Sequence, residues 1–123
     1  MEITLSTPIQ EDRMSVEIAA RALNAFAARQ QVTAHNIANS STQGFVPQRV
    51  DLEEDQTGGV QARLHEASQV PKPSSPLQDP PPSSTDLTQE MITMMATERA
   101  YDANAVMLSS QATLQGRLIN ELV

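Results

Sequence analysis

Residues 86–122 read DLTQEMITMMATERAYDANAVMLSSQATLQGRLINEL, a stretch without proline and with one glycine, Gly116. It predicts a single continuous helix of about 37 residues, about 55 Å long. Asp86 followed three residues later by Gln89 is typical of a helix N-terminus, because each side chain can bond the other's backbone. We therefore expect the helix to begin near Asp86.

Apolar and small residues recur through this helix at alternating spacings of four and three, which is the pattern of a coiled-coil seam. A helix with such a seam needs a partner helix. Its polar members Glu98 and Gln115 are of the kind that fixes the register between paired helices at a cost in stability. A locally solvated seam explains them equally well. The seam comprises Leu87, Met91, Met94, Glu98, Tyr101, Ala105, Leu108, Ala112, Gln115, Ile119 and Leu122.

Residues 15–39 predict a second helix with a second seam, and their many alanines favour helix and allow close approach by a neighbour. We expect residues 1–14 to form a polar N-terminal extension, with at most a short helical turn beginning at Pro8. A first helix about twelve residues shorter than the second would leave about 18 Å of the long helix as an overhang. The second seam comprises Val16, Ala19, Leu23, Phe26, Gln30, Thr33 and Ile37.

The first helix is expected to end in residues 36–45, NIANSSTQGF. Asparagines, hydroxyls and a glycine in this run compete for backbone hydrogen bonds and tolerate left-handed geometry. Phe45 then supplies an apolar anchor that lets the chain fold back, and Pro47 prevents the helix from resuming.

The middle segment, residues 46–85, predicts extended structure. Two short apolar runs flank Gly58 and Gly59, which suggests a small β-hairpin. The acidic residues between Asp51 and Asp55 are interpreted as a solvated turn, since they lack the spacing of a calcium-binding loop. Residues 70–85 hold six of the eight prolines, with serines between them, and predict an extended connector.

Composition excludes several classes of protein. An aromatic content of 2% makes a large core unexpected, and a net charge of −7 opposes binding to nucleic acid or to anionic membranes. The chain has no cysteine for disulfides, thiolate metal sites or nucleophiles. It also has no apolar run of about 18 residues and no N-terminal signal of the secretory type.

Residues suited to catalysis do not form a recognisable motif. His35 and His65 lack metal-ligand spacing, and no phosphate-binding loop or nucleophile elbow is present. We expect no catalytic, cofactor-binding or metal-binding residues. Met91, Met94, Met95 and Met107 indicate ordinary helix packing or, alternatively, an adaptable groove for a partner helix.

Two stretches resemble one family. Residues 34–45, AHNIANSSTQGF, resemble the Ala-Asn-Asn-x-Ala-Asn-x-x-Thr-x-Gly-Phe signature that ends the first helix of bacterial flagellar rod and hook proteins, with His35 at the first Asn. Residues 86–104 resemble the family's second signature, in which a Glu-Met pair precedes Arg-Ala-Tyr-x-Ala-Asn. The short middle makes the chain most similar to the small proximal-rod subunits.

The resemblance implies a mainly α fold in which residues 15–45 and 86–123 pair as an antiparallel coiled coil. It implies a non-enzymatic subunit of the basal-body rod that stacks helically with its own copies and other rod proteins into the axial drive shaft. Export would use the flagellar type III apparatus without a cleaved signal, and neither nucleic acid nor membrane insertion would be involved.

The residues expected to act fall into two sets. The turn would be set by Asn36, Asn39, Thr42, Gly44 and Phe45. Helix packing and subunit contacts would use Leu23, Phe26, Ile37, Met91, Met94, Glu98, Tyr101, Ala105, Leu108 and Ile119. The alternative function is a cytoplasmic helical adaptor or flagellar export chaperone that binds a partner helix.

Overall fold

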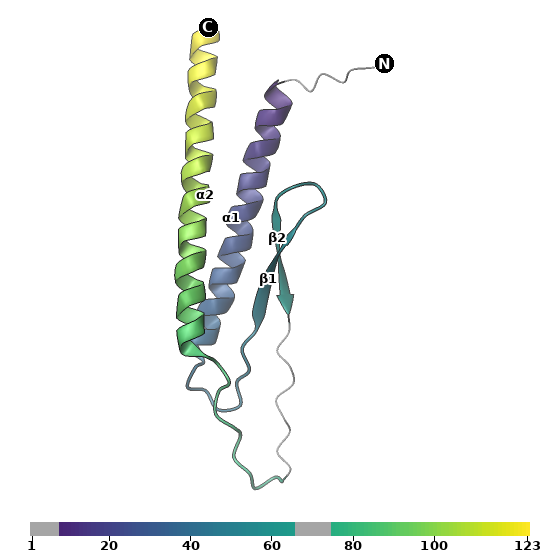
Figure 1. Ribbon diagram of the computed structural model, residues 1–123, viewed down its shortest axis with the longest axis vertical. Helices are drawn as coiled ribbons and strands as arrows, with labels where there is room; N and C mark the ends of the chain where they lie inside the picture. The colour runs from purple at the N-terminus through teal and green to yellow at the C-terminus, as the bar shows by residue number, and fades with distance from the viewer. Residues whose placement is uncertain (1–7, 66–74) are drawn as a thin grey trace.

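The computed structural model describes residues 8–65 and 75–123, which form two helices and a two-stranded sheet. The elements are α1 (Pro8–Ala38), β1 (Arg49–Glu54), β2 (Val60–His65) and α2 (Leu87–Leu122). Helices α1 and α2 lie side by side and run in opposite directions, while the hairpin packs along the other flank of α1 (Figure 1). The mainly α class and the small hairpin are thus confirmed. Residues 1–7 of the predicted extension and residues 70–74 of the predicted connector lie outside the described residues.

Helix α1 starts at Pro8, well before the start expected at residue 15. Proline suits the first helical position because its fixed φ is already helical and its missing N–H would have no partner there. The polar residues that follow are adequate helix formers, so they continue the helix; most of residues 10–14 are exposed, and half-buried Asp12 accepts a hydrogen bond from Gln115 of α2. The helices have 31 and 36 residues. The expected overhang therefore shrinks from about twelve residues to about five, or about 8 Å.

Helix α2 begins where its capping residues predict. Asp86 is extended, with φ −84° and ψ 97°, and its side chain accepts a hydrogen bond from the backbone N–H of Gln89 at 3.1 Å. Glu90 adds a negative charge in the first turn, next to the positive end of the helix dipole.

The hairpin corrects one interpretation of the acidic run. Residues 51–54 belong to strand β1 and not to a solvated turn. Asp51 pairs with His65 at 2.9 Å and Glu53 with Arg63 at 3.1 Å, across to β2. Side chains along β1 alternate between the two faces of the sheet. Val50 and Leu52 are half-buried on one face, and Asp51 between them is exposed on the other.

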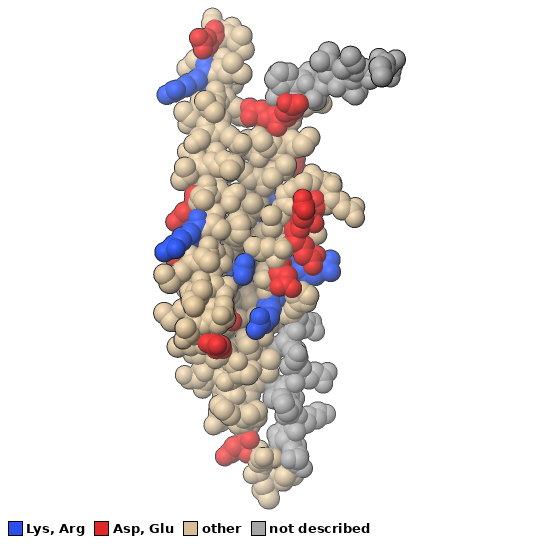
Figure 2. All heavy atoms as spheres, viewed as in Figure 1, with Lys and Arg blue, Asp and Glu red and all other residues tan. Residues whose placement is uncertain are grey.

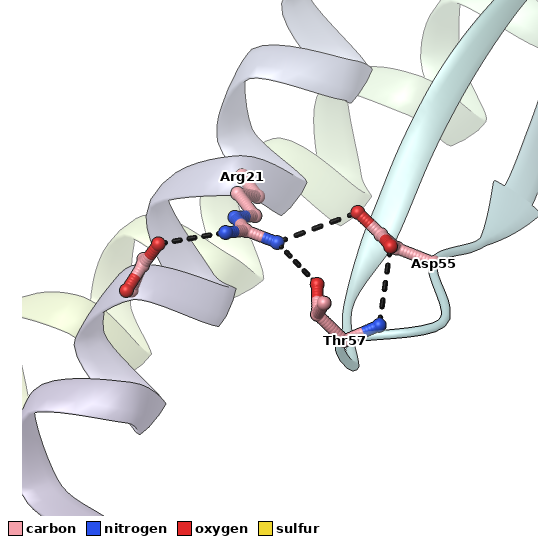
Figure 3. Close-up of polar contacts among 4 residues, drawn as sticks. Arg21, Asp55 and Thr57 are labelled. Carbon is pink, nitrogen blue, oxygen red and sulfur yellow. Dashed lines mark hydrogen bonds and ion pairs between the residues drawn. The ribbon is translucent and has the colours of Figure 1, made fainter. Parts of the chain in front are cut away.

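The tip of the hairpin is fixed to α1 by Arg21 (Figure 3). One nitrogen of Arg21 donates to Asp55 at 3.3 Å and to Thr57 at 2.7 Å, and the other donates to Glu17 at 2.7 Å. Asp55 in turn accepts from the backbone N–H of Thr57 at 3.1 Å. A polar cluster thus joins the β-turn to the flank of α1 on which the hairpin packs.

This cluster predicts an acid-sensitive hairpin. The backbone N–H of Thr57 lowers the pKa of Asp55 below its usual value, helped by the Thr57 hydroxyl and Arg21 and opposed by partial desolvation. Because the folded pKa is the lower one, the contact stabilises fully above the unfolded pKa of about 3.9 and is lost as pH falls through the folded pKa. Hydrogen exchange at the Thr57 amide should accelerate, relative to its intrinsic rate, as the pH falls below about 4.

The matched variants for this prediction are Asp55→Asn and Asp79→Asn. The first removes the titrating carboxylate from the cluster, so the acid-dependent loss of protection should disappear. Asp79 is exposed and outside the cluster, so its variant should behave as the parent chain. An unchanged pH profile in Asp55→Asn would assign the acid sensitivity to another group.

The interior contains small side chains, as the composition predicts. Within the described ranges, the buried apolar residues are Ala19, Ala22 and Ala25. Alanine allows α1 to approach its neighbours closely, but its burial removes little apolar surface from water. No helix of the described part is long and apolar enough to cross a membrane. Those residues also contain no group of three His, Cys, Asp or Glu side chains placed to hold a metal ion.

Candidate functional site

The turn after α1 is closed by short-range hydrogen bonds from the residues named for it. The side-chain amide of Asn39 donates to the carbonyl of His35 at 2.9 Å, and the Thr42 hydroxyl donates to the Asn39 side chain at 3.1 Å. The backbone N–H of Thr42 donates to the Asn39 carbonyl at 3.0 Å, and that of Phe45 to the Thr42 carbonyl at 3.2 Å. Asn39 therefore stabilises both the end of the helix and the loop that follows.

Gly44 and Phe45 join this turn to the segment that leads into α2. Gly44 has φ +74°, a conformation that favours glycine, and its N–H donates to the Pro81 carbonyl at 2.6 Å. The N–H of Ser84 donates to the carbonyl of Phe45 at 3.1 Å. The rings of Phe45 and His35 meet edge to face, with centroids 5.5 Å apart.

Asn36 lies within α1, before the turn, and connects three segments. It is only 1% exposed. Its amide donates to the Gln48 carbonyl at 2.8 Å and to the Glu90 carboxylate at 3.2 Å, and its oxygen accepts from the Gln48 N–H at 3.0 Å. The end of α1, the entry to β1 and the first turn of α2 thus share one buried amide.

The face of α2 turned towards α1 is polar and small in its first half. Thr97 is buried, and Glu90, Thr93, Ala100 and Asn104 are half-buried. The predicted seam lies on the adjacent flank there. A 3.5-residue repeat on a helix of 3.6 residues per turn drifts by about 20° per heptad, so the seam approaches the α1-facing side only in the second half.

The residues named for packing are divided between half-buried and exposed positions. On α2, Met94, Ala105 and Leu108 are half-buried, whereas Met91, Glu98, Tyr101 and Ile119 are exposed. On α1, Leu23, Phe26 and Ile37 are half-buried. The first half of the predicted seam is therefore mostly surface, with half-buried Met94 as the exception.

A groove of about 360 Å³ runs between the helices along this flank. It brings together three of the residues named from the sequence, Phe26 from α1 with Glu98 and Tyr101 from α2. Gln30, a polar member of the α1 seam, also lines the groove, and its buried side-chain oxygen has no hydrogen-bond partner within the described ranges. The groove is thus largely apolar, with hydrogen-bond acceptors in its lining.

Two family models match the chain at these two elements. The model for flagella basal body rod protein matches residues 17–45, which run from α1 through the turn to Phe45. The model for the flagellar basal body rod FlgEFG protein C-terminal matches residues 83–121, which include the Asp86 cap and nearly all of α2. No curated protein matches the sequence.

The two matched stretches together span more than half of the chain. They meet in the structure where Asn36 bonds Glu90 and where Phe45 bonds Ser84. The protein therefore belongs to the flagellar basal body rod protein family, whose members are structural components of the flagellar basal body.

Proposed function

We propose that this protein is a subunit of the proximal part of the rod and assembles helically with its own copies and with other rod proteins. In this proposal α1 and α2 pair as an antiparallel coiled coil, and further helices pack on the pair to build the axial drive shaft. Family membership supports assembly with other rod proteins and also favours export through the flagellar type III apparatus without a cleaved signal.

The observation that carries this proposal is the apolar surface of α2. Large apolar side chains are exposed along the whole helix, from 40% for Tyr101 to 79% for Leu122. Burying one such side chain contributes about 1.5–3 kcal/mol, and extensive apolar surface is uncommon on proteins that act alone. The exposed set on α2 comprises Leu87, Met91, Ile92, Met95, Tyr101, Val106, Met107, Leu114, Leu118, Ile119 and Leu122.

The turn has a mechanical role in the same proposal. A shaft that transmits torque needs subunits whose two helices do not slide past each other. Asn36 joins both helices through Glu90, and the Gly44 N–H holds the segment before α2. These contacts fix the register of the pair at one end and leave the apolar flanks available to neighbours.

A cytoplasmic adaptor or export chaperone is the alternative, favoured by the exposed Met91 and Met95 beside half-buried Met94. Methionines adapt to varied partner surfaces. Such a protein would hold one partner helix in the cytoplasm and would not enter the assembled shaft.

Purified basal bodies discriminate between the two functions. A rod subunit should co-purify with the axial structure after detergent and high-salt washing, and deletion of its gene should abolish rods and swimming. A chaperone should remain in the soluble fraction even when rods are complete. Recovery of the chain only in the soluble fraction of cells with intact basal bodies would overturn the proposal.

A further inference from the structure

Two hydrogen-bond acceptors in the lining of the groove between Phe26 and Tyr101 have no partner among the described residues. Glu98 lies in the groove lining and forms no ion pair with any described residue. The buried oxygen of Gln30 in the same lining has no partner there either. Two acceptors in an apolar groove suit a ligand that combines aliphatic side chains with a cationic donor.

The second half of α2 carries such a combination on its surface. Leu114 and Leu118 are 64% and 59% exposed. Arg117 lies one turn after Leu114, is exposed, and has no carboxylate partner in the described part of the chain. A guanidinium offers several N–H donors, so it suits a carboxylate and an amide oxygen together.

The groove and this second surface cannot meet within one chain. Leu114 and Leu118 follow Glu98 by 16 and 20 residues, which at about 100° per residue places them about 160–200° around the helix. The same spacing separates them by roughly 24–30 Å along the helix axis. Figure 2 shows broad areas of the helix pair without charged atoms between separate clusters of charge.

Two different surfaces at opposite ends and on opposite sides of one helix cannot form a two-fold dimer through themselves. A contact between them joins unlike surfaces of successive copies, and it leaves one free surface at each end of the growing chain. Contacts of this kind add copy after copy and give an open filament, unless the rotations between successive copies close them into a ring.

We propose that the groove binds the second half of α2 from a second copy, with Arg117 of that copy pairing with Glu98 and Leu114 filling the space beside Phe26 and Tyr101. Successive copies are then displaced by roughly 24–30 Å along the helix axis. This inference rests on the proposed function, because it names the contact through which copies of the rod subunit assemble.

Cysteine cross-linking tests this contact cleanly, because the natural chain has no cysteine. The Glu98→Cys and Arg117→Cys variants should each give no cross-linked dimer alone and should give a dimer when mixed. One chain that carries both substitutions should give a ladder of multimers. Gln61→Cys, on an exposed position of β2, is the control and should react with neither. All three sites are exposed, and circular dichroism should show unchanged helix content.

Specific outcomes would overturn the proposal. Efficient self-cross-linking of Glu98→Cys alone would indicate a two-fold interface, and a product with a different rod protein would name another occupant. Absence of the ladder in purified basal bodies that contain the doubly substituted chain would refute the contact while leaving the rod assignment intact. Absence of the chain from basal bodies would instead refute the proposed function.

Charge reversal provides a second measurement in the same cells. Glu98→Arg and Arg117→Glu should each reduce swimming, because each places like charges across the contact. The two substitutions together restore opposite charges and should recover motility. Failure of the double variant to improve on both single variants would count against the pairing.

Discussion

Replacing Asn36 by alanine is expected to lower the free energy of unfolding by about 2–4 kcal/mol and to abolish swimming. The side chain is 1% exposed and makes three hydrogen bonds, one of them to a carboxylate. Alanine leaves the N–H and carbonyl of Gln48 without this partner and removes the donor that Glu90 faces. Urea unfolding followed by circular dichroism measures the loss, and motility plates report its effect on assembly.

Asn104→Ala is the matched control. Asn104 is a half-buried asparagine, but its amide donates only to the Ala100 carbonyl of its own helix, at 3.0 Å. Its loss should change stability by less than about 1 kcal/mol, because alanine is the better helix former. Equal effects of the two variants would show that Asn36 does not connect the segments. Asn36→Asp keeps the acceptor and the shape but loses both donor bonds, so it should be no more stable than the alanine variant.

Local signals were sufficient to predict both helices and the hairpin. The start of α2 at Asp86 could be predicted because helix capping depends on residues three positions apart. The turn at Gly44 after α1 could be predicted because left-handed backbone favours glycine. The start of α1 was missed for a related reason. The polarity of residues 10–13 indicates a segment that need not be buried in a core, and it does not oppose a helix that carries these side chains.

The contacts of the site depend on distant parts of the chain and had no local signal. Glu90 is 54 residues from Asn36, and the spacing of neither residue indicates the other. The hydrogen bond between the Gly44 N–H and the Pro81 carbonyl joins backbone atoms. Backbone atoms are common to all sequences, so no residue pattern indicates this bond. Named turn residues were therefore found, but their partners across the fold were not.

The pattern of apolar residues also does not identify the face of α2 that contacts α1. Ile92, Val106 and Leu114 are exposed outside the predicted seam, so apolar residues surround much of the helix. A search for alternating spacings of three and four selects one apolar stripe from several. The contact with α1 in the first half uses Thr93, Thr97 and Ala100 instead, because small side chains permit a close approach of the backbones.

Substituting alanine for glycine should have opposite effects at Gly44 and Gly116. Gly44 has φ +74°, where an L-residue costs about 1–2 kcal/mol. Gly116 is inside α2, and a Cβ added there meets no atom within 4 Å. Alanine at Gly116 should stabilise the helix by up to about 1 kcal/mol, so the two variants differ in sign although the chemical change is identical.

Gly44→Val should have the larger effect and should stop rod assembly. A Cβ added at Gly44 would lie in contact with the Cβ of Pro80, at 3.4 Å, so the two methyl groups of valine add bulk next to the segment whose Pro81 carbonyl accepts from Gly44. A β-branched residue at positive φ is in addition strongly disfavoured. The valine chain should unfold at lower urea concentration and be missing from basal bodies, whereas Gly116→Val should swim. Normal swimming of Gly44→Val would show that the tie between the turn and Pro81 is dispensable, and that α1 and α2 keep their register through the Asn36–Glu90 and Asp12–Gln115 contacts.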